Sequence, residues 1–288
     1  MIWSTASRAA DDPLRLPAAG PWEINYAEDN CNLGRRFGEG DQEISMVMSR
    51  FSPSDRFRLI LTGPGLLRLH TRGEATIQFG PVEEEQEIEF LTGQSRGSKT
   101  MFVVGQPRIA PWSEEEQALL ERSPGGDPQF VDIQPIGFER LGAVEYLLFD
   151  APGLPAIQLE TGSLREPFEA FDRCMDELLT HWGIDVERHR SLTRPATPVG
   201  SVGRWIVTSD YPRAMIRGRN QGIVYFRLNV GLSGEVTACH IQQSTRPEGF
   251  EDAVCRALQR RARFDPALDA DGNPVASYYV NSVSFQMP

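Results

Sequence analysis

Apolar and polar residues alternate along residues 223–230, near the C-terminal end of the chain. Apart from Ile223 and Tyr225, the odd positions are polar, whereas every even position from Val224 to Val230 is apolar. A period of two predicts a strand that buries one face. Turn residues at 232–235 separate it from residues 236–243, which are therefore expected to return as an antiparallel strand.

Residues 247–261 show helical spacing instead. Their apolar positions share one helical face: Phe250, Val254, Ala257 and Leu258. We expect this face to cover the sheet. Pro266 prevents the helix from continuing, and Asp271-Gly272 favours a tight turn before a last strand that reaches Phe285. With a first helix between Tyr211-Pro212 and Gly222, the order is helix, strand, strand, helix, strand.

Four short motifs punctuate this region in a fixed order. They are Tyr211-Pro212, Gly222 with Val224, Phe264-Asp265-Pro266-Ala267, and Gly272-Asn273-Pro274-Val275. The C-terminal domain of the TonB family carries such motifs before its first helix, before a Val-rich strand, after its second helix and ahead of its last strand. Residues 205–288, about a quarter of the chain, therefore resemble that domain. The resemblance implies a small αββαβ domain with a three-stranded antiparallel sheet.

The resemblance also implies how this domain works. TonB C-terminal domains bind an extended peptide of an outer-membrane transporter by adding it to a sheet edge. By resemblance the edge is the last strand, with the candidate binding residues Tyr278, Tyr279, Val280, Asn281, Ser282 and Val283. This stretch has no charge and no Pro, so no side chain blocks pairing with a partner peptide or a second copy of the chain. If the N–H of Asn281 faces the partner, Asn281→Pro should abolish association, and Ser282→Pro should address the opposite edge.

The first two thirds of the chain contain short apolar runs between Gly and Pro turns. Strands are predicted at 22–27, 43–51, 57–63, 74–79, 87–91 and 99–104, with further apolar segments at 141–149 and 154–159. A short helix is predicted at 113–122, capped by Ser113. A longer helix at 167–182 carries an apolar stripe formed by Phe168, Phe171, Met175, Leu178 and Trp182. The fold class is therefore α+β, with a β-rich antiparallel N-terminal domain that ends in a helix.

Composition shifts predict the domain boundaries. Residues 1–20 are interpreted as a loose leader, 21–190 as a β-rich domain, 191–203 as a linker, and 204–288 as the TonB-like domain. The linker interpretation depends on Pro195, Pro198, Gly200 and Gly203, which leave backbone groups poorly paired and open to proteases.

Length and charge exclude some partners. The 288 residues are 40% hydrophobic, enough for a sizeable core, and carry a net charge of −11. Nucleic acid and anionic membrane surfaces are therefore poor partners.

No run is long enough to span a bilayer. Residues 1–10 show no signal peptide, and neither an anchor nor a long spacer is visible, so the chain is not expected to transmit force from the inner membrane by itself. The TonB resemblance nevertheless implies a periplasmic location.

The sequence shows no catalytic, metal or cofactor motif. His70, His181, His189 and His240 lack ligand spacing, and there is no Gly-x-Ser-x-Gly. Residues 93–99 lack the Gly-Lys-Ser/Thr of a phosphate loop, and the acidic residues at 83–87 are interpreted as a solvated turn rather than a cation site. The chain is therefore interpreted as a non-enzymatic binding protein. Two alternatives stay open: a structural or dimerisation role for the C-terminal domain, and a hydrolase site in the N-terminal domain.

Four cysteines divide equally between the two predicted domains. Cys239 lies on the same strand face as Ile241, and Cys255 lies at the margin of the helical stripe that covers that face. Cys31 follows the first strand and Cys174 flanks the stripe of the 167–182 helix. The pairs Cys31–Cys174 and Cys239–Cys255 are therefore predicted, with four buried free thiols as the alternative. The presence of two cysteines in each predicted domain and the resemblance to the TonB family both favour an oxidising compartment. Disulfides are therefore expected rather than free thiols.

Overall fold

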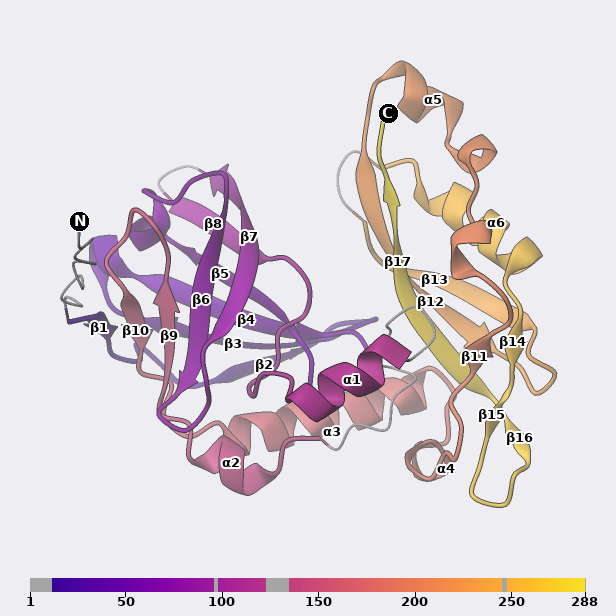
Figure 1. Ribbon diagram of the computed structural model, residues 1–288, viewed down its shortest axis with the longest axis horizontal. Helices are drawn as coiled ribbons and strands as arrows, with labels where there is room; N and C mark the ends of the chain where they lie inside the picture. The colour runs from indigo at the N-terminus through magenta and orange to yellow at the C-terminus, as the bar shows by residue number, and fades with distance from the viewer. Residues whose placement is uncertain (1–11, 96–97, 123–134, 245–247, 288) are drawn as a thin grey trace, which may run out of the picture. The chain divides into compact units, whose positions relative to one another are not determined.

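The computed structural model describes residues 12–95, 98–122, 135–244 and 248–287 (Figure 1). The chain divides into two compact units. The N-terminal unit comprises Met1–Ala27, Cys31–Gln117 and Gln134–Met175, and the C-terminal unit comprises Glu28–Asn30, Ala118–Ile133 and Asp176–Pro288. Each unit contains a sheet and at least one helix, which confirms the predicted α+β class.

The N-terminal unit is built on a ten-stranded sheet in the order β1-β10-β9-β6-β7-β8-β5-β4-β3-β2. Every neighbouring pair is antiparallel except β1 and β10, which run parallel. The strands are β1 (Leu14–Leu16), β2 (Glu23–Tyr26), β3 (Cys31–Phe37), β4 (Ile44–Arg50), β5 (Arg58–Gly63), β6 (Arg72–Gly80), β7 (Gln86–Ser95), β8 (Ser98–Val103), β9 (Tyr146–Asp150) and β10 (Ile157–Leu159).

The segment predicted as a loose leader is part of this sheet. β1 pairs with β10, and Ala18 then forms a bridge to Phe37 of β3. The N–H of Ala19 donates to the carbonyl of Arg36 at 2.8 Å. The described part of the leader therefore joins β1, at one end of the strand order, to β3, the second strand from the other end. Composition did not indicate this, because β1 has only three residues and its pairing partners lie far away in the sequence.

Helix α3 (Arg165–His181) confirms the predicted apolar stripe. All five stripe residues are buried: Phe168, Phe171, Met175, Leu178 and Trp182. Within the N-terminal unit, the guanidinium of Arg50 lies 4.9 Å from the ring of Phe168 and 4.5 Å from the ring of Phe171. The disulfide Cys31–Cys174 joins β3 to α3 across a Cα–Cα distance of 6.2 Å, as predicted.

Two shorter helices complete this part of the chain, α1 (Glu114–Arg122) and α2 (Phe138–Gly142). The hydroxyl of Ser113 accepts the N–H of Glu116 at 3.2 Å, and the carboxylate of Glu116 accepts the N–H of Ser113 at 2.8 Å. These reciprocal bonds cap α1 at the predicted residue.

The acidic turn near residue 83 is a correction to the sequence interpretation. The side chain of Glu83 is only 3% exposed. Its carboxylate accepts two hydrogen bonds from Arg140 of α2, at 3.1 and 2.5 Å. Glu84 and Glu85 are exposed. The turn is therefore solvated at two residues but buried at the first, because a distant arginine compensates the carboxylate charge.

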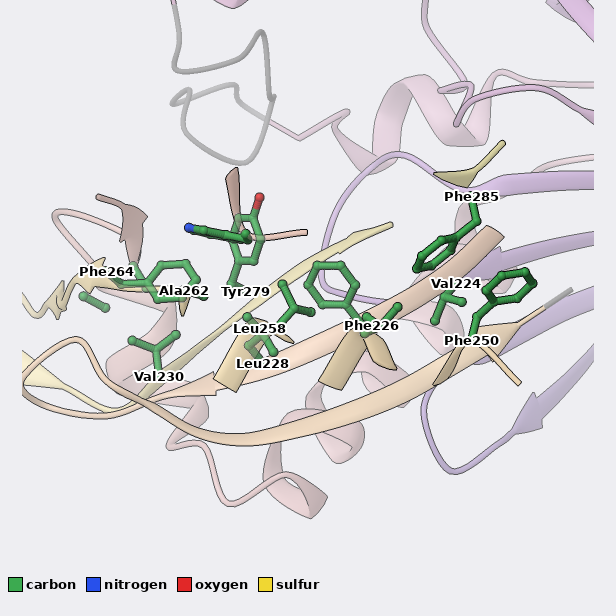
Figure 2. Packing of buried hydrophobic residues seen from close by; sticks show 14 of the residues in the cluster. Val224, Phe226, Leu228, Val230, Phe250, Leu258, Ala262, Phe264, Tyr279 and Phe285 are labelled. Carbon is green, nitrogen blue, oxygen red and sulfur yellow. The ribbon is translucent and has the colours of Figure 1, made fainter. Parts of the chain in front are cut away.

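The C-terminal unit contains a three-stranded antiparallel sheet in the order β13-β12-β17. Its elements follow the predicted order: α5 (Arg213–Arg217), β12 (Gly222–Val230), β13 (Val236–Ser244), α6 (Glu251–Arg261) and β17 (Ser277–Phe285). Figure 2 shows the core between them, where Phe226 and Leu228 of β12 meet Tyr279 of β17 and Leu258 of α6. The even positions of β12 are buried, as the alternation predicted.

The turn between β12 and β13 depends on Gly234. Its φ is +79°, and a Cβ there would collide with the carbonyl oxygen of Phe264. The carbonyl of Gly234 also accepts the N–H of Phe264 at 3.0 Å. Glycine is needed at this position because the backbone adopts a left-handed conformation and approaches another backbone segment closely.

Residues 191–203, predicted as a linker, belong to the C-terminal unit and carry backbone hydrogen bonds within it. They follow α4 (Val186–Arg190) and include β11 (Thr197–Pro198), which pairs with β14 (Phe264–Asp265). The N–H of Thr193 donates to Leu268 at 2.9 Å, and that of Val199 to Arg263 at 2.8 Å. The hairpin of β15 (Ala267–Leu268) and β16 (Pro274–Val275) follows. These bonds differ from the poorly paired backbone expected of a linker.

Candidate functional site

Strand β17 contains all six residues of the predicted binding edge and ends one side of the sheet. It pairs with β12 through nine consecutive antiparallel pairs, from Gly222↔Phe285 to Val230↔Ser277, without a register shift. Among the strands that the structure describes, β12 is its only neighbour in the sheet. Figure 1 shows β17 in yellow beside β12. One side of β17 is therefore occupied along its whole length, and the opposite side is the sheet edge.

The direction of the backbone N–H groups along β17 follows from two hydrogen bonds. The carbonyl of Asn229 in β12 accepts from Thr237 Oγ1 of β13, at 3.2 Å, so the odd residues of β12 direct their backbone groups toward β13. The N–H of Ser282 in β17 donates to Oδ1 of Asn281 at 2.7 Å rather than to β12. Because backbone groups alternate along a strand, both bonds assign the outward N–H groups of β17 to its even residues.

The direction of these N–H groups reverses the roles of Asn281 and Ser282 in the predicted proline substitutions. Asn281→Pro was expected to abolish association on the condition that the N–H of Asn281 faces the partner, with Ser282→Pro addressing the opposite edge. In the structure the N–H of Ser282 is outward, and Asn281 lies in register with Phe226 of β12. Sequence alternation could not distinguish these arrangements, because it shows which residues share a side-chain face but not which way their N–H groups point.

The odd residues of β17 belong to the core face of the sheet. Tyr279 is 1% exposed, and its ring packs 5.1 Å from Phe264 and 5.6 Å from Trp205, between ring centroids. The amide Nδ2 of Asn281 donates to the Tyr279 hydroxyl at 2.5 Å. Tyr279, one of the predicted binding residues, is therefore a core residue that positions Asn281.

Tyr278 lies on the other face of the sheet, where its ring packs against Trp182 and His189. Its ring centroid lies 5.4 Å from that of Trp182 and 5.2 Å from that of His189. Its hydroxyl lies 3.4 Å from Nε2 of His189. Burial raises the pKa of Tyr278 and lowers the pKa of His189, so both side chains are neutral near pH 7. Of the other predicted binding residues, Val283 packs against the core cluster of this unit, and Ser282 is exposed apart from the bond of its N–H to Asn281.

Arg227 of β12 is a buried charged residue on this second face. It is 3% exposed, and its guanidinium donates to Asn229 at 2.6 Å and to Asp29 at 3.3 Å. Burial lowers the pKa of Arg227, and Asp29 opposes that shift. A hollow of about 160 Å³ adjoins it, lined by Glu28, Asp29, His181, Trp182, Arg227, Asn229 and His240. Its lining contains groups of both charge signs, so it shows no preference for an anion or a cation.

The histidines form no metal centre in the described residues. His181 and His240 line the hollow, whereas His189 packs against Tyr278. Burial, and then the charge of Arg227, lower the pKa of His240. No group of three His, Cys, Asp or Glu side chains within the described ranges is arranged to hold a metal ion. No helix in those ranges is both long and apolar enough to cross a membrane.

The second predicted disulfide, Cys239–Cys255, is confirmed. It joins β13 to α6 across a Cα–Cα distance of 5.6 Å. Both cysteines lie where the sequence pattern placed them, on the sheet face covered by α6 and at the margin of its apolar stripe. With Cys31–Cys174, it leaves no free thiol in the protein.

The comparison with protein families agrees with the fold of this unit. Residues 208–287 match the family described as Gram-negative bacterial TonB protein C-terminal. The predicted resemblance to the TonB C-terminal domain is therefore confirmed for this segment. No curated protein matches the chain.

Proposed function

We propose that this protein is a non-enzymatic periplasmic adaptor that binds an extended segment of another protein as a fourth strand beside β17. The observation that carries the proposal is the position of β17 at the end of the three-stranded sheet, in a TonB-type domain. A strand at a sheet edge presents backbone donors and acceptors to an added chain.

The side chains of β17 favour such pairing. The strand reads Ser-Tyr-Tyr-Val-Asn-Ser-Val-Ser-Phe, with no charge and no Pro. Charges, Pro and bulges are the usual features that protect an edge strand from added chains. The pairing with β12 is free of register shifts, so the edge is regular over nine residues.

The TonB family suggests the class of partner. Proteins of that family act in transport at the outer membrane, where their C-terminal domains bind a peptide of a transporter. We infer that the partner here is likewise an extended segment of an outer-membrane protein. The net charge of −11 disfavours nucleic acid as an alternative partner.

The disulfides support the compartment. Two disulfides and no free thiol are typical of proteins that fold in an oxidising environment such as the periplasm. Each disulfide joins a strand to a helix, and so contributes to a packed core rather than to a redox-active exposed site.

A proline at Val280 tests the proposal. The N–H of Val280 has the same parity as that of Ser282 and faces outward, so Val280→Pro removes one edge donor without removing a bond to β12. Isothermal titration should use the full chain and synthetic peptides copying the periplasm-facing segments of outer-membrane transporters from a Gram-negative bacterium. We expect Val280→Pro to weaken binding at least tenfold and the control Val280→Thr, which keeps the N–H, to bind like the unmodified protein.

Circular dichroism must show that both variants are folded. Equal affinities for Val280→Pro and Val280→Thr would exclude addition of the transporter peptides at this edge. If no peptide binds but sedimentation velocity shows a dimer that Val280→Pro disrupts, the edge serves dimerisation instead.

A further inference from the structure

The outward N–H of Ser282 is occupied by a side chain of its own strand. Oδ1 of Asn281 accepts this N–H at 2.7 Å, and Nδ2 of the same amide donates to the hydroxyl of Tyr279 at 2.5 Å. Ser282 itself is exposed and Asn281 is half-buried. The amide of Asn281 thus lies between a buried ring and the edge of the sheet.

The orientation of the amide depends on the core. Tyr279 is 1% exposed, and it packs against Trp205, Phe226 and Phe264. Its hydroxyl is therefore held in place, and the bond from Nδ2 directs Oδ1 of Asn281 toward the N–H of Ser282. An acceptor placed in this way competes with the carbonyl of an incoming strand.

We infer that Asn281 is a cap that regulates strand addition at β17. The inference rests on the proposed function, because it concerns the same edge. A partner strand whose carbonyl faces Ser282 must displace Oδ1 of Asn281 before it can pair there. The strand otherwise lacks the charges and Pro that protect a sheet edge. The cap therefore disfavours non-specific strand pairing, including pairing with β17 of a second copy.

The partner that fits this edge is an extended polypeptide. Its backbone hydrogen bonds to other residues of β17 compensate for the displaced bond between Ser282 and Asn281. Displacing the cap exchanges one hydrogen bond for another at Ser282 and releases Asn281. The cap therefore weakens binding by about the net strength of one hydrogen bond, or roughly fivefold to tenfold in affinity.

Three substitutions at Asn281 separate the cap from other roles of the residue. Asn281→Ala removes the acceptor, and Asn281→Leu removes it while keeping a similar size. Asn281→Asp is the matched control, because its carboxylate still accepts the N–H of Ser282. The full chain is used throughout, with circular dichroism as the check on folding, and the leucine variant serves if the alanine variant is unstable.

Two measurements decide the inference. The first is amide hydrogen exchange at Ser282 by NMR, which should become faster in the alanine and leucine variants but not in the aspartate variant. The second is binding of a synthetic peptide that copies residues 277–285, a second copy of β17, measured by titration. We expect about fivefold to tenfold tighter binding by the alanine and leucine variants than by the unmodified protein and the aspartate variant.

Unchanged exchange at Ser282, or equal or absent peptide binding by all four proteins, would overturn the cap. Neither result affects the titration of transporter peptides against Val280→Pro. Failure of the cap is therefore distinguishable from failure of strand addition. If Val280→Pro shows no effect while uncapping still tightens binding of the β17 copy, the cap holds and the choice of partner is wrong.

Discussion

The guanidinium of Arg227 lies over the indole ring of Trp182, with 4.0 Å between Cζ and the ring centroid. The two residues belong to different elements of the C-terminal unit: Arg227 to β12, and Trp182 to the residues that directly follow α3. The same indole ring meets Tyr278 of β17 edge to face. The face of the TonB-type sheet opposite α6 is therefore covered by an aromatic side chain from upstream of the family match.

Removing the Trp182 ring should destabilise the C-terminal unit. Trp182→Ala leaves a cavity and exposes Arg227 and Tyr278, and a buried Trp→Ala change costs about 3–5 kcal/mol. Trp182→Phe keeps a ring face over the guanidinium and should cost clearly less. Urea unfolding followed by circular dichroism gives both values. Equal losses for the two variants would show that a phenyl ring over the guanidinium of Arg227 does not stabilise this face.

The two disulfides should contribute unequally to stability. Cys239–Cys255 spans 16 residues and Cys31–Cys174 spans 143. By chain entropy, the first stabilises by about 3 kcal/mol and the second by about 5 kcal/mol. Replacing each pair with alanines and comparing urea midpoints tests the order. Mass spectrometry after alkylation without reduction should find no modified cysteine, and four modified cysteines would contradict both bonds and the oxidising compartment.

Stability of the C-terminal unit should fall as the pH decreases below about 6.5, the ordinary pKa of histidine. Burial lowers the pKa values of His189 and His240 in the folded protein. The unfolded chain therefore binds protons first, and acid favours unfolding until the pH is also below the folded pKa values. His189→Phe keeps a ring beside Tyr278 but cannot titrate. Thermal melts at pH 7.5 and 5.5 should show a smaller pH effect in this variant than in the unmodified protein.

A second decrease in stability is expected at lower pH and concerns Asp210. Its carboxylate accepts hydrogen bonds from Arg261 at 2.6 and 3.0 Å, and these bonds lower the pKa of Asp210. A carboxylate with a lowered folded pKa stabilises the protein above its unfolded pKa, about 3.9, and this contribution is lost as the pH falls through the folded pKa. Asp210→Asn should flatten the stability profile below pH 4. An unchanged profile would show that the pair is too solvated to matter.

The parts of the structure that sequence predicted well are those where one local pattern decides the outcome. Val224 to Val230 alternate because one face of β12 is buried and the other is not. The stripe of α3 and the positions of Cys239 and Cys255 follow in the same way from helix and strand periods. In each of these elements, burial of a single face was enough to select the conformation.

The features that sequence missed depend on residues far apart in the chain. Arg227 has the polar character of an exposed strand position, yet Trp182, which directly follows α3, covers it. Glu83 was expected in water, but Arg140 reaches it from α2. The bond between Asn281 and Ser282 is local, but Tyr279 in the core orients the amide. No periodicity in the sequence indicates these partners.

The smallest stable C-terminal fragment should begin near Asp176 and not at residue 204. Residues 191–203 donate backbone hydrogen bonds to Arg263 and Leu268, and Arg188 pairs with Asp269 at 2.5 Å. A fragment of residues 204–288 loses these bonds as well as the ring that covers Arg227 and Tyr278. We therefore expect residues 176–288 to unfold cooperatively at a higher urea concentration than residues 204–288. Limited proteolysis of the full chain should spare residues 191–203, because their backbone groups are paired. Rapid cleavage there, together with equal stability of the two fragments, would instead support the boundary predicted from the sequence. Residues 191–203 would then be a linker.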